Sequence, residues 1–320
     1  MDSELYPLIT AERQATGVSI ATWFLATTFL IMYFSGQSVK FVLLRRFRLD
    51  DYLMVLATAS AFGLSFAYWI AASNGLGNSS ISPQELDIVQ KACYVADILY
   101  IPSISLVKLS LLVFIRQIAV DIKQSRFILY LVIAITINTA AFFFASAFQC
   151  QVPHVWEIYT LRCFDQSGFW IAFGVIDILT DLLIIIASIM LVWNVQIPLS
   201  RKFVVVGCFA PRTLVIIASV CRLVYLVPIS PQDDPSFRIW ISVVCTEVQV
   251  CMSISSACIP AVKPLFEVIE AGVWQAEHFR RRGLSLDDLH SRGYLKDTTS
   301  WLKLAGNATS TEVPTVEMRI

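Results

Sequence analysis

The chain has 320 residues, of which 57% are hydrophobic and 15% are charged, whereas a soluble domain is about half apolar and about a quarter charged. Its 24 basic and 24 acidic residues balance to a net charge of zero, so no overall basic character points to nucleic acid. With a mean hydropathy of +0.68, the composition excludes an ordinary soluble domain and predicts a polytopic membrane protein.

Seven apolar segments follow one another along the chain, each long enough for a membrane-spanning helix, which takes about 20 residues. Residues 1–16 precede them as a short polar N-terminus that lacks the basic region of a cleavable signal peptide. The fold class is therefore all-α, a seven-transmembrane-helix bundle over residues 17–262. We expect its helices at residues 17–44, 52–72, 92–115, 127–149, 167–193, 203–229 and 239–262.

The tail, residues 263–320, begins with an apolar stretch to Trp274 that suits the membrane surface. The basic cluster at 280–282 then suits anionic lipid head groups, although an ordinary flank that stops membrane insertion explains the same pattern. We expect an amphipathic segment here and disorder over the last residues of the tail.

Lysine and arginine in the short connectors set the predicted orientation. The connectors after the first, third and fifth segments contain eight such residues, and those after the second, fourth and sixth contain three. Because basic loops stay on the cytoplasmic side, we expect an outer N-terminus and a cytosolic tail, in the plasma membrane or the endoplasmic reticulum.

Two features of the outer loops depend on this orientation. Asn78 begins an Asn-Ser-Ser sequence, which matches the acceptor for N-glycosylation. Cys150 and Cys163 lie in the loop after the fourth segment, where an oxidising compartment favours a disulfide between them. Cys93 lies on the same side and competes for Cys163, so the pairing stays open.

Four of the predicted helices, the third, fifth, sixth and seventh, contain seven ionisable side chains. A charge there costs about 2.5 kcal/mol or more and normally has a partner in the bundle interior. Asp177 and Asp181 are four residues apart and therefore share one helical face. Counted from the outer end of each segment, the seven divide into two layers, each with both signs. The outer layer contains Asp97, Asp177, Arg222 and Glu247, and the inner layer contains Lys108, Asp181 and Arg212.

Two interpretations of these charges stay open. They line a polar cavity that binds a molecule or relays protons, or they form ion pairs that fix helix register while Lys108 extends its ammonium to the cytosol. Seven groups over four helices exceed what register requires, which favours the cavity. Pro211, just before Arg212, is expected to kink the sixth helix and free a backbone carbonyl.

Several more specific sites require residues that this sequence does not place in the necessary pattern. The last segment has no lysine for a retinal Schiff base, and no His, Cys and carboxylate cluster has zinc spacing. No glycine loop suited to phosphate follows a strand, and no Ser, His and Asp arrangement is evident. We therefore expect no metal and no cofactor, while acid–base chemistry by Asp177 or Asp181 beside Arg212 stays open.

Short motifs also follow one another in a distinctive order. They are Leu49–Tyr52, Lys108–Leu112, an outer loop with Cys150, Trp156 and Cys163, then Asp181, Arg222, Trp240, Glu247 and Cys258–Phe266. In this order the chain resembles the fungal rhodopsin-like seven-helix integral membrane protein family, which includes the Pth-type receptor-like proteins and the satratoxin-cluster membrane protein. The resemblance covers about residues 17–270.

The resemblance implies, besides the lipid bilayer, a small lipophilic molecule as a partner and a link to a secondary-metabolite biosynthetic cluster. One implied role is a receptor-like sensor that signals through its inner loops to an unidentified cytoplasmic protein. The other is a pathway protein, either a membrane-bound acid/base enzyme or a carrier. The third helix ends in Phe114-Ile115-Arg116-Gln117, without the acidic-Arg-aromatic signature of G-protein-coupled receptors. We favour a small-molecule-binding protein associated with secondary metabolism, whose reaction is undemonstrated.

A first test follows from the cavity interpretation. We expect Asp181→Asn to disturb function more than folding, because a cavity side chain serves the ligand and not the bundle. Surface expression of the variant measures folding, and complete loss of expression would favour the ion-pair interpretation.

Overall fold

A computed structural model describes residues 14–44, 48–76, 82–119, 121–149, 166–194, 207, 210–226 and 240–260. Within these ranges the chain forms seven helices and no strand, which confirms the all-α prediction. The helices are α1 (Ala15–Leu44), α2 (Leu49–Ser73), α3 (Pro83–Ile118), α4 (Ile122–Ala147), α5 (Gln166–Asn194), α7 (Pro211–Leu226) and a last helix, Trp240–Pro260.

Six of these helices are long and apolar enough to cross a membrane, and the described part of α7 is shorter, at 16 residues. The protein is therefore an integral, multi-pass membrane protein. By contacts the chain divides into two compact units, one of residues 1–33 and 48–260 and the other of residues 34–47 and 261–320. All packing described below belongs to the first unit.

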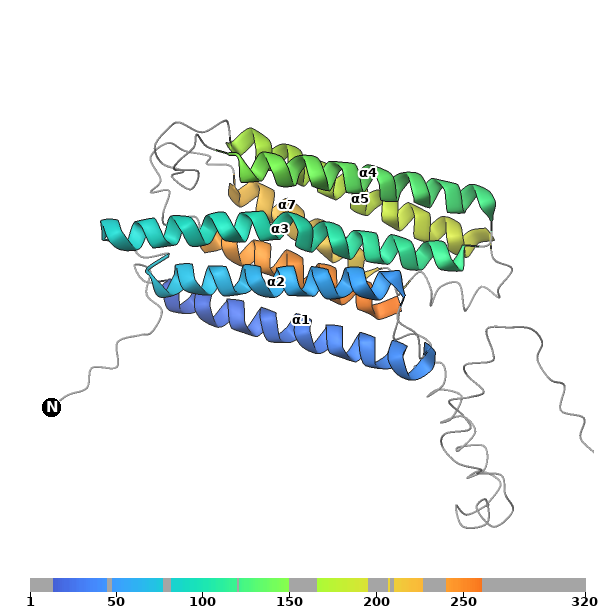
Figure 1. The fold of residues 1–320 in the computed structure, drawn as a ribbon, viewed down its shortest axis with the longest axis horizontal. Helices are drawn as coiled ribbons and strands as arrows, with labels where there is room; N and C mark the ends of the chain where they lie inside the picture. The colour runs from blue at the N-terminus through green and yellow to red at the C-terminus, as the bar shows by residue number, and fades with distance from the viewer. Residues whose placement is uncertain are drawn as a thin grey trace, which may run out of the picture. The chain divides into compact units, whose positions relative to one another are not determined.

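Helix α3 is the central element of this unit. It packs against α2, α4 and α5, and α5 packs in turn against α4 and α7; Figure 1 shows α2, α3, α4 and α5 side by side. In the most apolar stretch of α3, 67% of the residues are buried, against 17% in α4. The exposed residues of α4 are large and apolar, among them Tyr130, Ile137 and Phe144, as expected of a helix that faces lipid.

Polar caps make two helices begin earlier than the hydrophobic segments predict. Helix α3 starts at Pro83, because Ser82 Oγ accepts the Glu85 N–H (3.4 Å) and Glu85 Oε2 accepts the Ser82 N–H (3.0 Å). This reciprocal pair, followed by proline at the first helical position, is a strong start signal. Asp121 caps α4 in a similar way by accepting the Lys123 N–H (3.0 Å). Hydropathy alone misses such polar first turns.

The buried interior contains two apolar clusters. The first contains residues of α1, α2, the N-terminal part of α3, the start of α5 and the last helix. Its last member on α3 is Val107. The second begins at Leu109 and joins α3 to α4 and to the later part of α5. Lys108 therefore lies between the two clusters.

Two of the motifs that carry the family resemblance contact each other. Ser110, in the Lys108–Leu112 motif of α3, donates a hydrogen bond to the Asp50 carbonyl at the start of α2 (2.8 Å). Gln117 Nε2 donates to Asp50 Oδ1 (3.1 Å), and Asp51 Oδ2 accepts the Arg48 N–H (2.9 Å). The acidic pair thus caps α2 and ties it to α3.

Helix α2 ends on a glycine with a positive φ. Gly75 has φ 95°, the Leu76 N–H bonds to the Ala71 carbonyl (3.1 Å), and the Gly75 N–H bonds to the Ala72 carbonyl (3.2 Å). These two bonds define a Schellman motif, in which glycine avoids the steric cost of a Cβ in the left-handed conformation.

We expect Gly75→Ala to lower the free energy of unfolding by about 1–2 kcal/mol, because alanine is strained in the left-handed region. Thermal unfolding of the detergent-solubilised protein measures the change. Gly75→Asn is the matched control, since asparagine visits this region more readily; equal stability of the wild type and Gly75→Ala would contradict the prediction.

Candidate functional site

The Lys108 ammonium lies between two carboxylates of α5. Its Nζ is 2.6 Å from Asp177 Oδ1 and 3.2 Å from Asp181 Oδ1, and it also donates to the Asp177 carbonyl (2.7 Å) and to Thr180 Oγ1 (2.8 Å). The Lys108 side chain is only 2% exposed. The ammonium therefore does not extend to the membrane surface, and the snorkelling interpretation is wrong.

Arg212, in the first turn of α7, completes the charge balance. Its Nη2 and Nε lie 2.7 Å and 3.0 Å from Asp181 Oδ1, and its Nη1 donates to Ser256 Oγ of the last helix (3.3 Å). Pro211 is the first residue of α7, where a proline suits the helix start. Residues 208–209 lie outside the described residues, so the kink predicted for the sixth helix stays a prediction. The Pro211 ring fixes the backbone just ahead of the arginine.

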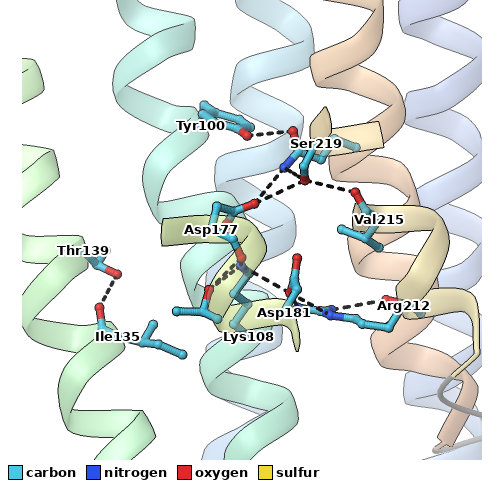
Figure 2. A network of polar contacts seen from close by, with 12 residues as sticks. Tyr100, Lys108, Ile135, Thr139, Asp177, Asp181, Arg212, Val215 and Ser219 are labelled. Carbon is cyan, nitrogen blue, oxygen red and sulfur yellow. Dashed lines mark hydrogen bonds and ion pairs between the residues drawn. The ribbon is translucent and has the colours of Figure 1, made fainter. Parts of the chain in front are cut away.

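The second oxygen of Asp177 belongs to a line of polar contacts (Figure 2). Asp177 Oδ2 accepts from Gln249 Nε2 (3.0 Å) and from Ser219 Oγ (3.4 Å). The Tyr100 hydroxyl donates to Gln249 Oε1 (2.8 Å). The contacts therefore run from Tyr100 through Gln249 and Asp177 to Lys108.

We call Lys108, Asp177, Asp181 and Arg212 the ion-pair network. Two cations and two carboxylates are formally neutral together, and each cation contacts a carboxylate directly. The network joins α3, α5 and α7, and through Ser256 the last helix. Such a neutral set balances its charges within the apolar interior, and one atom of it, the buried Asp181 Oδ2, makes no hydrogen bond within the described residues.

The outer and inner layers of charged residues predicted from depth agree with the structure only in part. Lys108, Asp181 and Arg212 of the inner layer do pair with one another. Asp177, assigned to the outer layer, pairs with Lys108 as well. One helical turn rises only about 5.4 Å, and the lysine side chain is long enough to reach both carboxylates.

Arg222 is buried without an ion pair. It is 3% exposed, and among the described residues no carboxylate lies within 4 Å of it. Its Nε donates to Thr246 Oγ1 (2.9 Å), and its Cζ lies 4.2 Å from the Tyr100 ring centroid and 5.0 Å from that of Trp170. Such cation–π contacts contribute about 2 kcal/mol when desolvated.

Asp97 and Glu247 lie in the surroundings of Tyr68, which is within electrostatic range of both carboxyl groups and of Arg222. Glu247 Oε2 accepts from Ser65 Oγ (2.9 Å), whereas its buried Oε1 has no hydrogen-bond partner in the described part of the chain. We call Tyr68, Asp97, Tyr100, Trp170, Arg222 and Glu247 the Arg222 group. Within the described residues its charges form no direct ion pair, unlike those of the ion-pair network.

Sequence reasoning found all seven charged residues but missed their uncharged partners. Tyr68, Tyr100 and Trp170 are aromatic residues in apolar segments, where the sequence alone does not distinguish them from core residues. Gln249 was missed as well, although the sequence does contain a signal for it. An amide in a membrane-spanning segment indicates an interhelical hydrogen bond.

Other predicted features fall elsewhere. Asn78, Cys150 and Cys163 lie outside the described residues, as do residues 1–13 and 261–320. Phe203, the predicted start of the sixth helix, lies outside them too. Cys93 carries a free thiol.

We expect Lys108→Met to lower the free energy of unfolding by about 3–5 kcal/mol, because it leaves two buried carboxylates with one cation. The double variant Lys108→Met/Asp177→Leu restores one cation to one carboxylate and should recover part of the loss. Asp181 Oδ1 contacts both cations, so Asp181→Asn should also impair folding. This differs from the sequence-based prediction, in which Asp181→Asn disturbs function more than folding.

Thermal unfolding in detergent micelles measures these changes. Lys91→Met is the matched control, since the Lys91–Asp87 pair has side chains 49% and 48% exposed, and an exposed pair contributes about 0–1 kcal/mol. If Lys108→Met were no more destabilising than Lys91→Met, the structural role of the network would be refuted.

A model of the fungal rhodopsin domain family matches residues 38–268. The SAT4 family membrane protein of Emericella nidulans is 26% identical over 223 residues, which are 68% of this chain and 54% of that relative. The chain thus spans about half the length of the curated relative it matches. The region that the family model matches contains the ion-pair network and the whole of the last helix, Trp240–Pro260.

Proposed function

Because this chain belongs to the fungal rhodopsin domain family, we propose that it is a multi-pass membrane protein that binds a small, largely apolar molecule in a charged intramembrane cavity. We further propose that it serves a fungal secondary-metabolite biosynthetic cluster. The link to a cluster rests on the resemblance to the satratoxin-cluster membrane protein. The binding function rests on the buried charges.

The observation that carries the binding function is the contrast between the two charged groups. The four residues of the ion-pair network contact one another directly and account for the register of their helices. Neither Arg222 nor Glu247 has an opposite charge within salt-bridge distance among the described residues. Unpaired buried charges are costly and concentrate at functional sites, so we place the ligand at the Arg222 group.

The orientation is part of the proposal. With the N-terminus outside and the tail cytosolic, the Arg222 group lies in the outer half of the bilayer and the ion-pair network lies deeper. A lipophilic molecule then reaches the Arg222 group from the outer leaflet or the outer aqueous phase. Asn78 would carry a glycan, and Cys150 and Cys163 would form a disulfide, on this same side.

One observation favours a sensor as the second candidate function. The Tyr100 ring contacts the Arg222 guanidinium, and the Tyr100 hydroxyl bonds to Gln249, which bonds to Asp177. A ligand that moved Arg222 would therefore act on the ion-pair network through contiguous contacts, as long-range coupling requires. Acid–base catalysis receives less support, because Asp177 and Asp181 already contact Lys108 or Arg212.

Metabolite profiling of matched strains tests the proposed function. The gene is deleted in the organism that carries it, and the deletion strain receives the intact gene, an Arg222→Gln variant or an Arg116→Gln variant. Arg116 is exposed at the end of α3, so its variant is the control for loss of one arginine charge. We expect an intermediate to accumulate in the deletion and Arg222→Gln strains, and wild-type profiles in the other two.

Membrane fractionation with an epitope tag confirms that each variant is inserted in equal amount. Altered transcription or development with unchanged intermediates would instead indicate the sensor. Wild-type metabolites, transcription and development in the Arg222→Gln strain would refute a function for the Arg222 group.

A further inference from the structure

We infer that the ligand presents a protonated amine to the Glu247 carboxylate. The inference rests on the proposed function, because it names the chemical class that the proposed site recognises. Two observations on the Arg222 group carry it. One oxygen of the Glu247 carboxylate lacks a hydrogen bond, and the carboxylate as a whole lacks a cation.

The missing hydrogen bond identifies the ligand group as a donor. Glu247 Oε2 accepts from Ser65 Oγ of α2 (2.9 Å), whereas the buried Oε1 accepts no hydrogen bond within the described residues. Glu247 is only 1% exposed, so bulk water does not take the place of the donor. Buried polar atoms in folded proteins are nearly always satisfied, and an ionised carboxylate oxygen only accepts. The partner that completes Glu247 is therefore an N–H or an O–H group.

The charges of the Arg222 group identify the donor as a cation. The group contains two carboxylates, Asp97 and Glu247, and one cation. Arg222 lies within electrostatic range of Asp97, whereas no cation lies within salt-bridge distance of Glu247 among the described residues. A carboxylate at membrane depth normally has a partner of opposite charge. A ligand with one positive charge at Glu247 would make the group formally neutral, as the ion-pair network already is.

A protonated amine meets both requirements, and simpler groups meet only one. A hydroxyl donates a hydrogen bond but brings no charge, and a quaternary ammonium brings a charge but has no N–H. A proton on Glu247 would remove the charge but would leave the hydrogen-bonding capacity of Oε1 unused. A hydrogen bond from an ammonium to a carboxylate is also about twice as strong as one between neutral groups.

The surroundings of Glu247 suit an apolar ligand body. Val243 and Val250 lie four residues before and three residues after Glu247, on the same face of the last helix. Tyr68 lies three residues after Ser65 on α2 and within electrostatic range of Glu247. All three are buried members of the first apolar cluster. The expected ligand is therefore a lipophilic amine, whose ammonium contacts Glu247 and whose carbon skeleton lies among apolar side chains.

Four probes on one anthracene skeleton test this inference on the full chain in phosphatidylcholine nanodiscs at neutral pH, where an alkylamine is protonated. They are 9-(aminomethyl)anthracene, 9-anthracenemethanol, the (9-anthracenylmethyl)trimethylammonium ion and 9-methylanthracene. In that order they present a charged donor, a neutral donor, a charge without a donor, and neither. Energy transfer from tryptophan to anthracene reports binding, and empty nanodiscs give the background from partitioning into lipid. We expect saturable binding of the amine, at least about tenfold tighter than that of the other three.

Two matched variants assign the binding to the carboxylate. Glu247→Gln keeps the shape of the side chain and one acceptor oxygen but removes the charge, so it should weaken binding of the amine at least about tenfold. Glu85→Gln makes the same replacement at an exposed position and preserves the capping box, so the affinity should stay unchanged. The comparison of the four probes on the wild type needs no variant and decides the matter alone if Glu247→Gln does not insert.

The outcomes separate this inference from the proposed function. Saturable binding of all four probes with equal affinity would preserve small-molecule binding and overturn the amine inference. Binding of the alcohol or of the trimethylammonium ion as tight as that of the amine would overturn it as well, and so would wild-type affinity for the amine in Glu247→Gln. If no probe bound saturably, the inference would be overturned, whereas the metabolite profiles of the matched strains would still decide the proposed function.

Discussion

The Lys108 ammonium between Asp177 and Asp181 is the interaction on which the bundle depends. One cation with two carboxylates would leave a net negative charge in an apolar interior, where charges are costly. Arg212 from α7 supplies the second cation and contacts Asp181 directly. The requirement for neutrality therefore brings α3, α5 and α7 to one level, and the hydrogen bond from Arg212 to Ser256 adds the last helix.

This polar layer lies where the two apolar clusters meet on α3. Neither cluster specifies the position of a helix along its axis, because lipid-facing and core-facing apolar side chains are chemically alike in a membrane. Directed contacts such as those of Lys108 provide that register. The bond between Ser110 and the Asp50 carbonyl does the same for α2 against α3, which gives a structural reason for two of the motifs behind the family resemblance.

The ion-pair network and the Arg222 group differ in how their charges are balanced. In the ion-pair network every charged group contacts an opposite charge, and its role in the bundle needs no ligand. In the Arg222 group the guanidinium contacts aromatic rings and one threonine. Gln249 and Tyr100 connect the two groups. The binding site that we propose at the Arg222 group and the ion-pair network thus share a single line of contacts, which is compatible with either a pathway role or a sensor.

The membrane class, the seven helices and the seven charges inside four of them are all evident from the sequence, because apolar runs and the charges within them are local signals. The sequence-based prediction placed the starts of α3 and α4 too late, since the capping residues Ser82, Glu85 and Asp121 lie outside the apolar runs. Which of these charges pair depends on the packing of the helices. Spacing puts Asp177 and Asp181 on one face of α5, but the partner of each depends on how four helices pack and how far Lys108 reaches. The same packing brings Tyr100 and Trp170 to Arg222, and no pattern along the chain indicates contacts between residues so far apart.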